Sequence, residues 1–280
     1  MIFRKGCFMK TFRTKKYEIV SSKIKEGEIK FAFLTDLHGL EFGENNSDLL
    51  RAVREFSPDA VLCTGDMLVR SEPDTLKTAK TLLKNLAEEY PVYVSLGNHE
   101  YKLLVSEDYK SMRETYKEYE LELETEGVHI LHNRHMELTV KGNRVAVYGL
   151  ELPLCYYDKP FARKLTAEEI TGFVGERKND FSILLAHSPR YGKTYFSWGA
   201  DLILSGHYHG GVMRFGENTG LVSSHLRVFP PFCCGEFKRG EQRMIVSAGL
   251  GEHTIPIRLH NPRELICITV KSPKEDVLWQ

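Results

Sequence analysis

The sequence predicts an α/β fold in which buried strands alternate with amphipathic helices, and three observations support this prediction. Apolar runs at 29–34, 60–63 and 92–96 have the length and composition of buried strands. The segments between them place apolar residues three or four positions apart, which is the spacing of a helix. A polar side chain follows each of these strands, at the end where parallel α/β sheets bind their ligands.

The first half of the chain supplies alternating strands and helices. The helix predicted at 46–56 begins near Asn46 or Ser47, either of which can cap it, and ends before Pro58. A second helix, predicted at 74–90, has one apolar face. This order predicts that the ends of the intervening strands meet at one edge of a sheet, although they lie far apart in the sequence.

The second half contains a highly charged helix, predicted at 106–126, and then shorter elements. Strands are predicted at 128–131, 136–140, 144–150, 181–186, 201–205, 243–247 and 264–270, with a hairpin turn at 141–143 and a helix at 166–174. No repeat or sharp change of composition interrupts the chain. We therefore expect a single domain over 29–280, preceded by a basic lead-in and a first strand within 1–28.

The composition is that of an ordinary globular protein. The chain has 280 residues, of which 42% are hydrophobic and 27% are charged, so it can bury a sizeable core. Its formal net charge is zero, which argues against general nucleic-acid binding, because such proteins normally carry an excess of basic residues. A local basic patch remains compatible with this balance.

The first sixteen residues are basic and contain no acidic residue. They lack the continuous apolar core of a signal peptide, and no stretch of the sequence approaches the ~20 apolar residues that span a bilayer. Two interpretations stay open for 1–16: peripheral contact with an anionic membrane, or a solvated lead-in to the first strand. The six scattered cysteines include no CxxC pair, so we expect a reducing, cytoplasmic location, with or without membrane contact.

One short stretch, Gly97-Asn98-His99-Glu100, contains residue types suited to a functional site. It follows the apolar run 92–96, and Gly97 allows the backbone to turn sharply there. Asn98 offers an oxygen ligand for a metal ion, and His99 offers a proton donor. On its own, such a turn after a strand is also common as a simple loop.

Four further stretches close strand-like runs with similar side chains. The complete set is Asp36-x-His38, Gly65-Asp66, Gly97-Asn98-His99-Glu100, Ala186-His187 and Gly206-His207-x-His209. Taken singly, Asp36 can be a helix cap, Asp66 a turn residue and His187 a core histidine. Together, carboxylates, imidazoles and an amide suit Mn, Fe or Zn better than Ca or Mg. None of the five stretches contains a cysteine, which excludes a structural zinc finger there.

This series resembles the motifs of the calcineurin-like metallophosphoesterases, whose pattern runs D-x-H, G-D, G-N-H-[DE], H and G-H-x-H. The tail is similar to that of the bacterial phosphodiesterase branch of the YkuE and YaeI type, whose wider relatives include hydrolases of UDP-2,3-diacylglucosamine. That second likeness is carried by Ser205-Gly206-His207-Tyr208-His209-Gly210-Gly211 and by Gly249-Leu250-Gly251 before Ile255-Pro256-Ile257-Arg258. Arg190 and Tyr208 depart from the expected pattern, in which an acid and a threonine are usual.

The resemblance implies an α/β fold of two facing mixed β-sheets flanked by helices, a four-layer αββα sandwich. It also implies two divalent metal ions, Mn, Fe or Zn, that share a hydroxide at neutral pH and orient a phosphate. One ion would be held by Asp36, His38 and His209, the other by Asn98, His187 and His207, and Asp66 would bridge them.

The resemblance further assigns His99 to the substrate, where it would steady phosphoryl oxygens or protonate the leaving group. Arg258 and His253 are weaker candidates for substrate contact. We expect hydrolysis of a phosphodiester or pyrophosphate in a small phosphorylated substrate, lipid-linked or nucleotide-linked. The alternatives are a non-catalytic scaffold that binds protein partners, and a hydrolase of lipid-linked substrates at the membrane surface.

Overall fold

The computed structural model describes residues 11–158, 162–221, 229–252 and 258–273. His253 and most of segment 1–16, for which membrane contact is one of two interpretations, lie outside these residues. Within them, no helix combines the length and the apolar character required to span a membrane.

The first sheet has six strands and is mixed. Its order across the sheet is β1 (Phe12–Val20), β14 (Arg263–Lys271), β2 (Glu28–Leu34), β3 (Ala60–Cys63), β4 (Val92–Val94) and β5 (Val128–Ile130). The four strands from β2 to β5 run parallel, whereas β14 runs antiparallel to β2 and parallel to β1. The parallel ends of β2, β3 and β4 therefore lie at one edge.

The second sheet also has six strands. Its order is β12 (Gly235–Arg239), β13 (Gln242–Val246), β9 (Leu202–Ser205), β8 (Phe181–Ala186), β7 (Asn143–Leu150) and β6 (Arg134–Val140). The strands from β13 to β7 are parallel, and antiparallel partners close both edges. A two-stranded ribbon, β10 (Arg214–Phe215) with β11 (Thr219–Gly220), lies outside both sheets.

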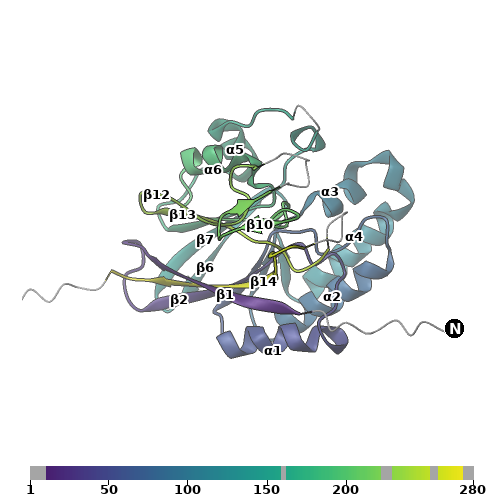
Figure 1. The fold of residues 1–280 in the computed structure, drawn as a ribbon, viewed down its shortest axis with the longest axis horizontal. Helices are drawn as coiled ribbons and strands as arrows, with labels where there is room; N and C mark the ends of the chain where they lie inside the picture. The colour runs from purple at the N-terminus through teal and green to yellow at the C-terminus, as the bar shows by residue number, and fades with distance from the viewer. Residues whose placement is uncertain (1–10, 159–161, 222–228, 253–257, 274–280) are drawn as a thin grey trace, which may run out of the picture.

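Helices cover the outer faces of the two sheets (Figure 1). The α-helices are α1 (Ser47–Phe56), α2 (Asp74–Ala87), α3 (Asn98–Val105), α4 (Lys110–Thr125), α5 (Ala167–Val174) and α6 (Gly192–Trp198). Short 3-10 turns occur at η1 (Glu44–Asn46), η2 (Glu107–Tyr109), η3 (Leu154–Tyr156) and η4 (Pro189–Tyr191). Helices α1, α2 and α4 pack on the first sheet, and α5 and α6 on the second.

Alternating side chains along the strands fill three apolar layers. In β2, Phe31 and Phe33 point toward the second sheet and meet residues such as Ile183 of β8. Ala32 and Leu34, on the other face of β2, pack against the helices. The predicted fold of two facing mixed sheets flanked by helices is confirmed.

Two short helices were not expected from the sequence. Helix α3 begins at Asn98, where the sequence suggested only a turn, and α6 spans Gly192–Trp198. At the start of α5, the side chain of Thr166 accepts a hydrogen bond from the backbone of Glu169, as expected for a capping residue. The start of α3 is the difference that matters for the site.

Candidate metal centre

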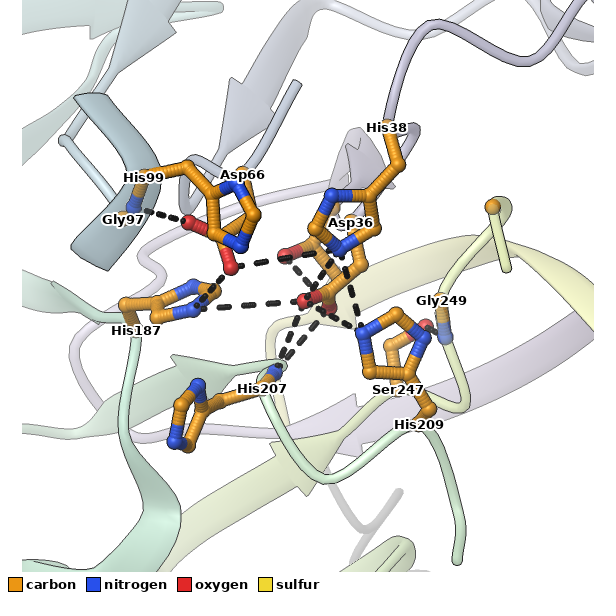
Figure 2. A network of polar contacts seen from close by, with 12 residues as sticks. Asp36, His38, Asp66, Gly97, His99, His187, His207, His209, Ser247 and Gly249 are labelled. Carbon is orange, nitrogen blue, oxygen red and sulfur yellow. Dashed lines mark hydrogen bonds and ion pairs between the residues drawn. The ribbon is translucent and has the colours of Figure 1, made fainter. Parts of the chain in front are cut away.

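The five predicted stretches come together where the two sheets meet. Asp36 and His38 follow β2, and Asp66 follows β3, while Asn98 opens α3 after β4. From the second sheet, His187 follows β8, and His207 and His209 follow β9. Figure 2 shows the imidazoles gathered around the carboxylates of Asp36 and Asp66. Each side chain thus reaches the site from the end of a strand, or from the helix that follows it.

The backbone at this site is strained. Five of the predicted ligands have left-handed backbone conformations, which are uncommon for residues other than glycine and cost of order 1–3 kcal/mol each. Their φ angles are 51° at Asp36, 48° at His38, 51° at Asp66, 66° at His207 and 49° at His209. Such strain persists only where the surroundings enforce it, and it gathers at functional sites.

Glycines and backbone amides hold the two carboxylates in place. A Cβ atom at Gly97 would collide with Asp66, and one at Gly206 would collide with Asp36. The backbone N–H of His207 donates to both carboxylate oxygens of Asp36, at 3.1 and 3.0 Å. The backbone N–H of His99 likewise donates to Oδ1 of Asp66, at 2.8 Å. Glycine is therefore required at these two positions because the loops approach within contact distance.

The first group of ligand atoms consists of Asp36, His38 and His209. One ligand atom from each lies within 4.8 Å of the others, close enough for a single metal ion. The Nε2 atom of His209 is 3.4 Å from Oδ1 of Asp36 and 3.2 Å from Nε2 of His38. The two imidazole rings stack with their centroids 5.0 Å apart.

The second group consists of Asp66, His187 and His207, again with ligand atoms within 4.8 Å of one another. His187 is buried, and its Nδ1 lies 2.8 Å from the carbonyl oxygen of Thr64. Because a carbonyl only accepts, Nδ1 carries a proton, so Nε2 is the ring nitrogen that can bind a metal ion. That nitrogen is 3.1 Å from Oδ2 of Asp66, in the orientation that a metal ligand requires.

Asn98 is the residue predicted to complete this second group. Its side-chain oxygen is buried and has no hydrogen-bond partner among the residues the structure describes. A buried oxygen without a partner is costly unless another group satisfies it, and a cation would do so. Asp66 also lies within 4.8 Å of ligand atoms of His38, so it is shared between the two groups. The donor set therefore fits a pair of divalent cations.

Burial and close charges shift the pKa values of these residues. Burial raises the pKa of Asp36. Burial acts in the same direction on Asp66, but His187 and His99 outweigh it and hold its pKa well below the usual range. Burial opposes protonation of His187, yet the charge of Asp66 raises the pKa of His187 to about 9. The site thus favours positive charge at this imidazole, and a bound cation would replace the proton.

His99 lies at the rim of the site. A ring nitrogen lies within 4.8 Å of ligand atoms of His38 and Asp66, so distance alone also permits a ligand role. Its ring nitrogens, however, both face Arg70. Nδ1 is 3.2 Å from the backbone nitrogen of Arg70, and Nε2 is 3.0 Å from its guanidinium. The predicted role of His99 toward the substrate stays a prediction.

Glu100 has a role that the sequence did not reveal. Its buried carboxylate accepts hydrogen bonds from the backbone N–H groups of Asp66 at 2.8 Å, Met67 at 2.7 Å and Gly97 at 3.2 Å. Burial and the charge of Asp66 raise its pKa to about 8. Glu100 thus ties the ends of two strands together. Its place as the fourth residue of the motif was the available signal.

Arg258 lies beside the first group of ligands. Its guanidinium donates to the carbonyl oxygens of Ala248 and Gly251 and lies 3.4 Å from Nδ1 of His209. Burial lowers its pKa to about 10. The predicted contact between Arg258 and substrate remains a prediction, and His253 lies outside the described residues.

Comparison with known families agrees with the geometry of this site. The model of the family described as calcineurin-like phosphoesterase matches residues 29–211. The chain therefore belongs to the calcineurin-like phosphoesterase family, as the motifs predicted. It is a metal-dependent phosphoric ester hydrolase, and the family acts on small phosphorylated substrates.

Individual relatives include YkuE and YaeI, the two proteins that define the predicted branch. The chain is 27% identical to an uncharacterized metallophosphoesterase of Aquifex aeolicus, over 92% of each chain. It is 24% identical to the uncharacterized metallophosphoesterase YkuE of Bacillus subtilis, covering 92% of this chain and 85% of that one. It is also 24% identical to phosphodiesterase YaeI of Escherichia coli, covering 86% and 82% respectively.

Proposed function

We propose that this protein hydrolyses a phosphodiester or pyrophosphate bond with the help of two divalent cations. The observation that carries the proposal is the position of Asp66, which is shared between two groups of candidate ligands. A bridging carboxylate reduces the repulsion between two cations held close together. The name of one relative, phosphodiesterase YaeI, supports the choice of diesters over simple monoesters.

Each cation would have its own set of residues. Asp36, His38 and His209 would hold the first, while Asn98, His187 and His207 would hold the second, with Asp66 between them. Bound there, the cations would supply an acidified water as nucleophile and positive charge for the phosphoryl oxygens. Manganese, iron and zinc all suit this mixture of imidazole and oxygen donors.

The residues of the chain would position the substrate and move the proton. His99 stands at the rim of the ligand cluster, with Nδ1 facing the backbone N–H of Arg70. In that orientation Nδ1 accepts and Nε2 carries the proton, which can pass to the departing oxygen. Glu100 and the backbone amides would keep both carboxylates fixed during the reaction.

Metal analysis combined with a substrate panel tests this proposal. The protein is stripped with a chelator, reloaded with Mn²⁺, Fe²⁺ or Zn²⁺, and its metal content is measured by elemental analysis. Hydrolysis is then followed with an aryl phosphomonoester, an aryl phosphodiester, cyclic nucleotides and UDP-diacylglucosamine. We expect two ions per chain and the fastest turnover on diesters or diphosphates.

The same experiment separates the alternatives. Full activity in metal-free protein would refute the mechanism, and failure to hydrolyse any substrate with two bound ions would favour the scaffold. Preference for the lipid-linked substrate would favour action at a membrane surface. Contact of residues 1–16 with a membrane stays a prediction, to be tested by sedimentation with anionic vesicles at low salt, with and without residues 1–12.

A further inference from the structure

The loop that follows β3 presents an arginine to the rim of the candidate metal centre. The loop is firmly anchored, because Gly39 donates to the carbonyl oxygen of Met67 at 2.9 Å and Val69 donates to the hydroxyl of Thr75 at 2.9 Å. Arg70 is the next residue and is half-buried. Its backbone is therefore held at a fixed distance from the ligands.

The side chain of Arg70 is directed to the site by two contacts. Its Nε donates to the hydroxyl of Tyr109 at 3.0 Å, and its Nη1 lies 3.0 Å from Nε2 of His99. The guanidinium also lies over the ring of Tyr109, 5.8 Å from the centroid. Among the described residues, no carboxylate lies within ion-pair distance of Arg70. The partly buried guanidinium thus keeps its charge available for an anionic ligand.

The contacts with His99 leave two donors facing each other. A neutral imidazole carries one proton, and the backbone N–H of Arg70 can only donate, so Nδ1 of His99 is the acceptor. The proton then resides on Nε2, which faces the guanidinium of Arg70. Neither group accepts a hydrogen bond in this state. The pair is satisfied when an oxygen acceptor carrying negative charge binds both of them.

We propose that Arg70 and His99 bind a second phosphoryl group, on the leaving-group side of the bond that is cleaved. This inference rests on the proposed function and narrows it to diphosphates. A planar guanidinium suits phosphate because it donates two parallel hydrogen bonds to adjacent oxygens. An alcohol leaving group would need only the proton of His99, and would bring no negatively charged phosphate of its own to Arg70.

The reaction balances without a further reactant. Water adds its oxygen to the phosphorus nearest the carboxylates, and the bridging P–O bond breaks. The electron pair of that bond leaves with the second phosphate, where negative charge develops beside Arg70. The two hydrogens of the water end on the two phosphate products or are released as protons. Arg70 is expected to stabilise this negative charge, which is larger in the transition state than in the bound substrate.

Two matched substrates test this inference: P1,P2-diphenyl pyrophosphate and phenyl p-nitrophenyl phosphate. Both offer the same phenyl phosphoryl group, and their leaving groups are comparably good, but only the first leaving group is a phosphate. We expect Arg70→Met to lose about 10- to 100-fold in kcat/KM on the pyrophosphate, the value of a charge-assisted hydrogen bond. On the nitrophenyl diester the loss should be no more than about threefold.

Further variants keep the test independent of folding. Arg54→Met removes an exposed arginine that pairs with Glu89, far from the site in the fold, and should change neither rate. Tyr109→Phe removes the hydroxyl that holds Arg70 and should show a smaller, equally selective loss. Arg70→Lys keeps the positive charge but cannot donate two parallel hydrogen bonds. It should therefore recover part of the pyrophosphate rate that Arg70→Met loses. If Arg70→Met fails to fold, these last two variants carry the comparison.

Three results would overturn the inference. An equal loss on both substrates would mean that Arg70 serves the scissile phosphate or the fold. Wild-type protein loaded with Mn²⁺ that cleaves the nitrophenyl diester but not the pyrophosphate would exclude a phosphate subsite, while leaving the proposed function intact. Wild-type protein that holds two ions and cleaves neither substrate would overturn both.

Discussion

At the scale of single residues, Asp66 is the side chain on which both groups of ligands depend. We expect Asp66→Asn, which keeps the shape and removes the charge, to hold fewer than two ions per chain. The loss of metal affinity should exceed the ~100-fold seen when residues behind a ligand are changed. Elemental analysis and Mn²⁺ titration measure this, with the exposed Asp48→Asn on α1 as the control. Two tightly held ions in Asp66→Asn would disprove the bridging role.

Substitution of His99 distinguishes acid catalysis by this residue from catalysis by the metal ions. If His99 protonates the leaving oxygen, His99→Ala should retain both ions but lose about 10²- to 10⁴-fold on alkyl esters, which need the proton. Nitrophenyl esters leave readily as anions, so most of that loss should disappear for them. The measurement is kcat/KM on both ester types under conditions limited by chemistry, with His260→Asn as the exposed control.

An equal loss on both esters, with metal content unchanged, would show that His99 positions the phosphoryl group. The acid role would then be wrong. This outcome would also concern Arg70, because its two contacts with His99 would then help only to bind the substrate.

The candidate ligands were predictable from the sequence, whereas the residues that support them were not. Asp36 and Asp66 each end a buried strand, and the ends of parallel strands meet whatever the details of the loops. The contacts of Glu100 and Arg70 depend on the path of the loop after β3 and on the start of α3. No periodic pattern of residues encodes such a path, so only the structure reveals these contacts.

At the scale of elements, the first turn of α3 is fixed to the loop after β3 by Glu100. Its carboxylate accepts three backbone hydrogen bonds, so we expect Glu100→Gln to place an amide NH₂ against a backbone N–H. An unsatisfied buried donor costs about 1–3 kcal/mol of unfolding free energy. Urea denaturation measures this cost, and Mn²⁺ titration should show weaker binding, because the backbone of Asp66 loses its anchor.

The exposed Glu122→Gln on α4 is the matched control, since its carboxylate forms an ion pair with Lys80 at the surface. If Glu100→Gln were as stable as the wild type and bound metal equally well, the proposed anchoring of Asp66 would be refuted.

A second link joins α4 to the end of β7 through His132. Its Nε2 lies 3.4 Å from Glu120 on α4, and its Nδ1 lies 3.0 Å from Glu151, which follows β7. These two carboxylates raise the pKa of His132 to about 10. A raised folded-state pKa means that the link contributes fully below the unfolded value of about 6.5 and is lost as pH rises toward 10.

We therefore expect His132→Gln to lower the unfolding free energy most at pH 6, by about 1 kcal/mol, since the half-exposed imidazole is screened by solvent. The difference from the wild type should shrink steadily as pH rises and vanish near pH 10. Denaturant unfolding at several pH values measures it. A difference that grew with pH would contradict the assigned charge.

Short helices escaped prediction for a physical reason. Helix α3 spans Asn98–Val105 and buries only Glu100 and Leu103, so its sequence carries little apolar periodicity. Longer helices such as α2, with six buried residues along one face, were predictable because that periodicity persists over several turns. The packing around α3, not its propensity, makes it helical.

At the scale of the whole molecule, the strands were predictable one by one but their pairing was not. Strand β1 joins β14, from the other end of the chain, and β14 in turn separates β1 from β2. A buried strand shows two apolar faces whether it faces a helix or another sheet, so its partners cannot be inferred from its own sequence. Only the resemblance to a family indicated the second sheet.

The arrangement also separates what folds the protein from what binds metal. The three apolar layers are formed by strand and helix residues, whereas the candidate ligands lie beyond the strand ends. A core of this size does not need a metal ion in order to form. The ligands, however, hold carboxylates close together on strained backbone, and a cation would relieve that repulsion.

We therefore expect the chelated protein to remain folded but to melt at a lower temperature. Binding stabilises the folded state by about 2.7 kcal/mol when free metal is 100 times its dissociation constant. For a chain of 280 residues, that corresponds to a rise of roughly 4–5 °C in Tm. Differential scanning calorimetry across a Mn²⁺ titration measures the shift, and far-UV circular dichroism reports the fold. Asp66→Asn should show a smaller rise, because it retains one group of ligands at most. Loss of the far-UV signal on chelation would contradict this expectation, because it would show that the fold depends on bound metal.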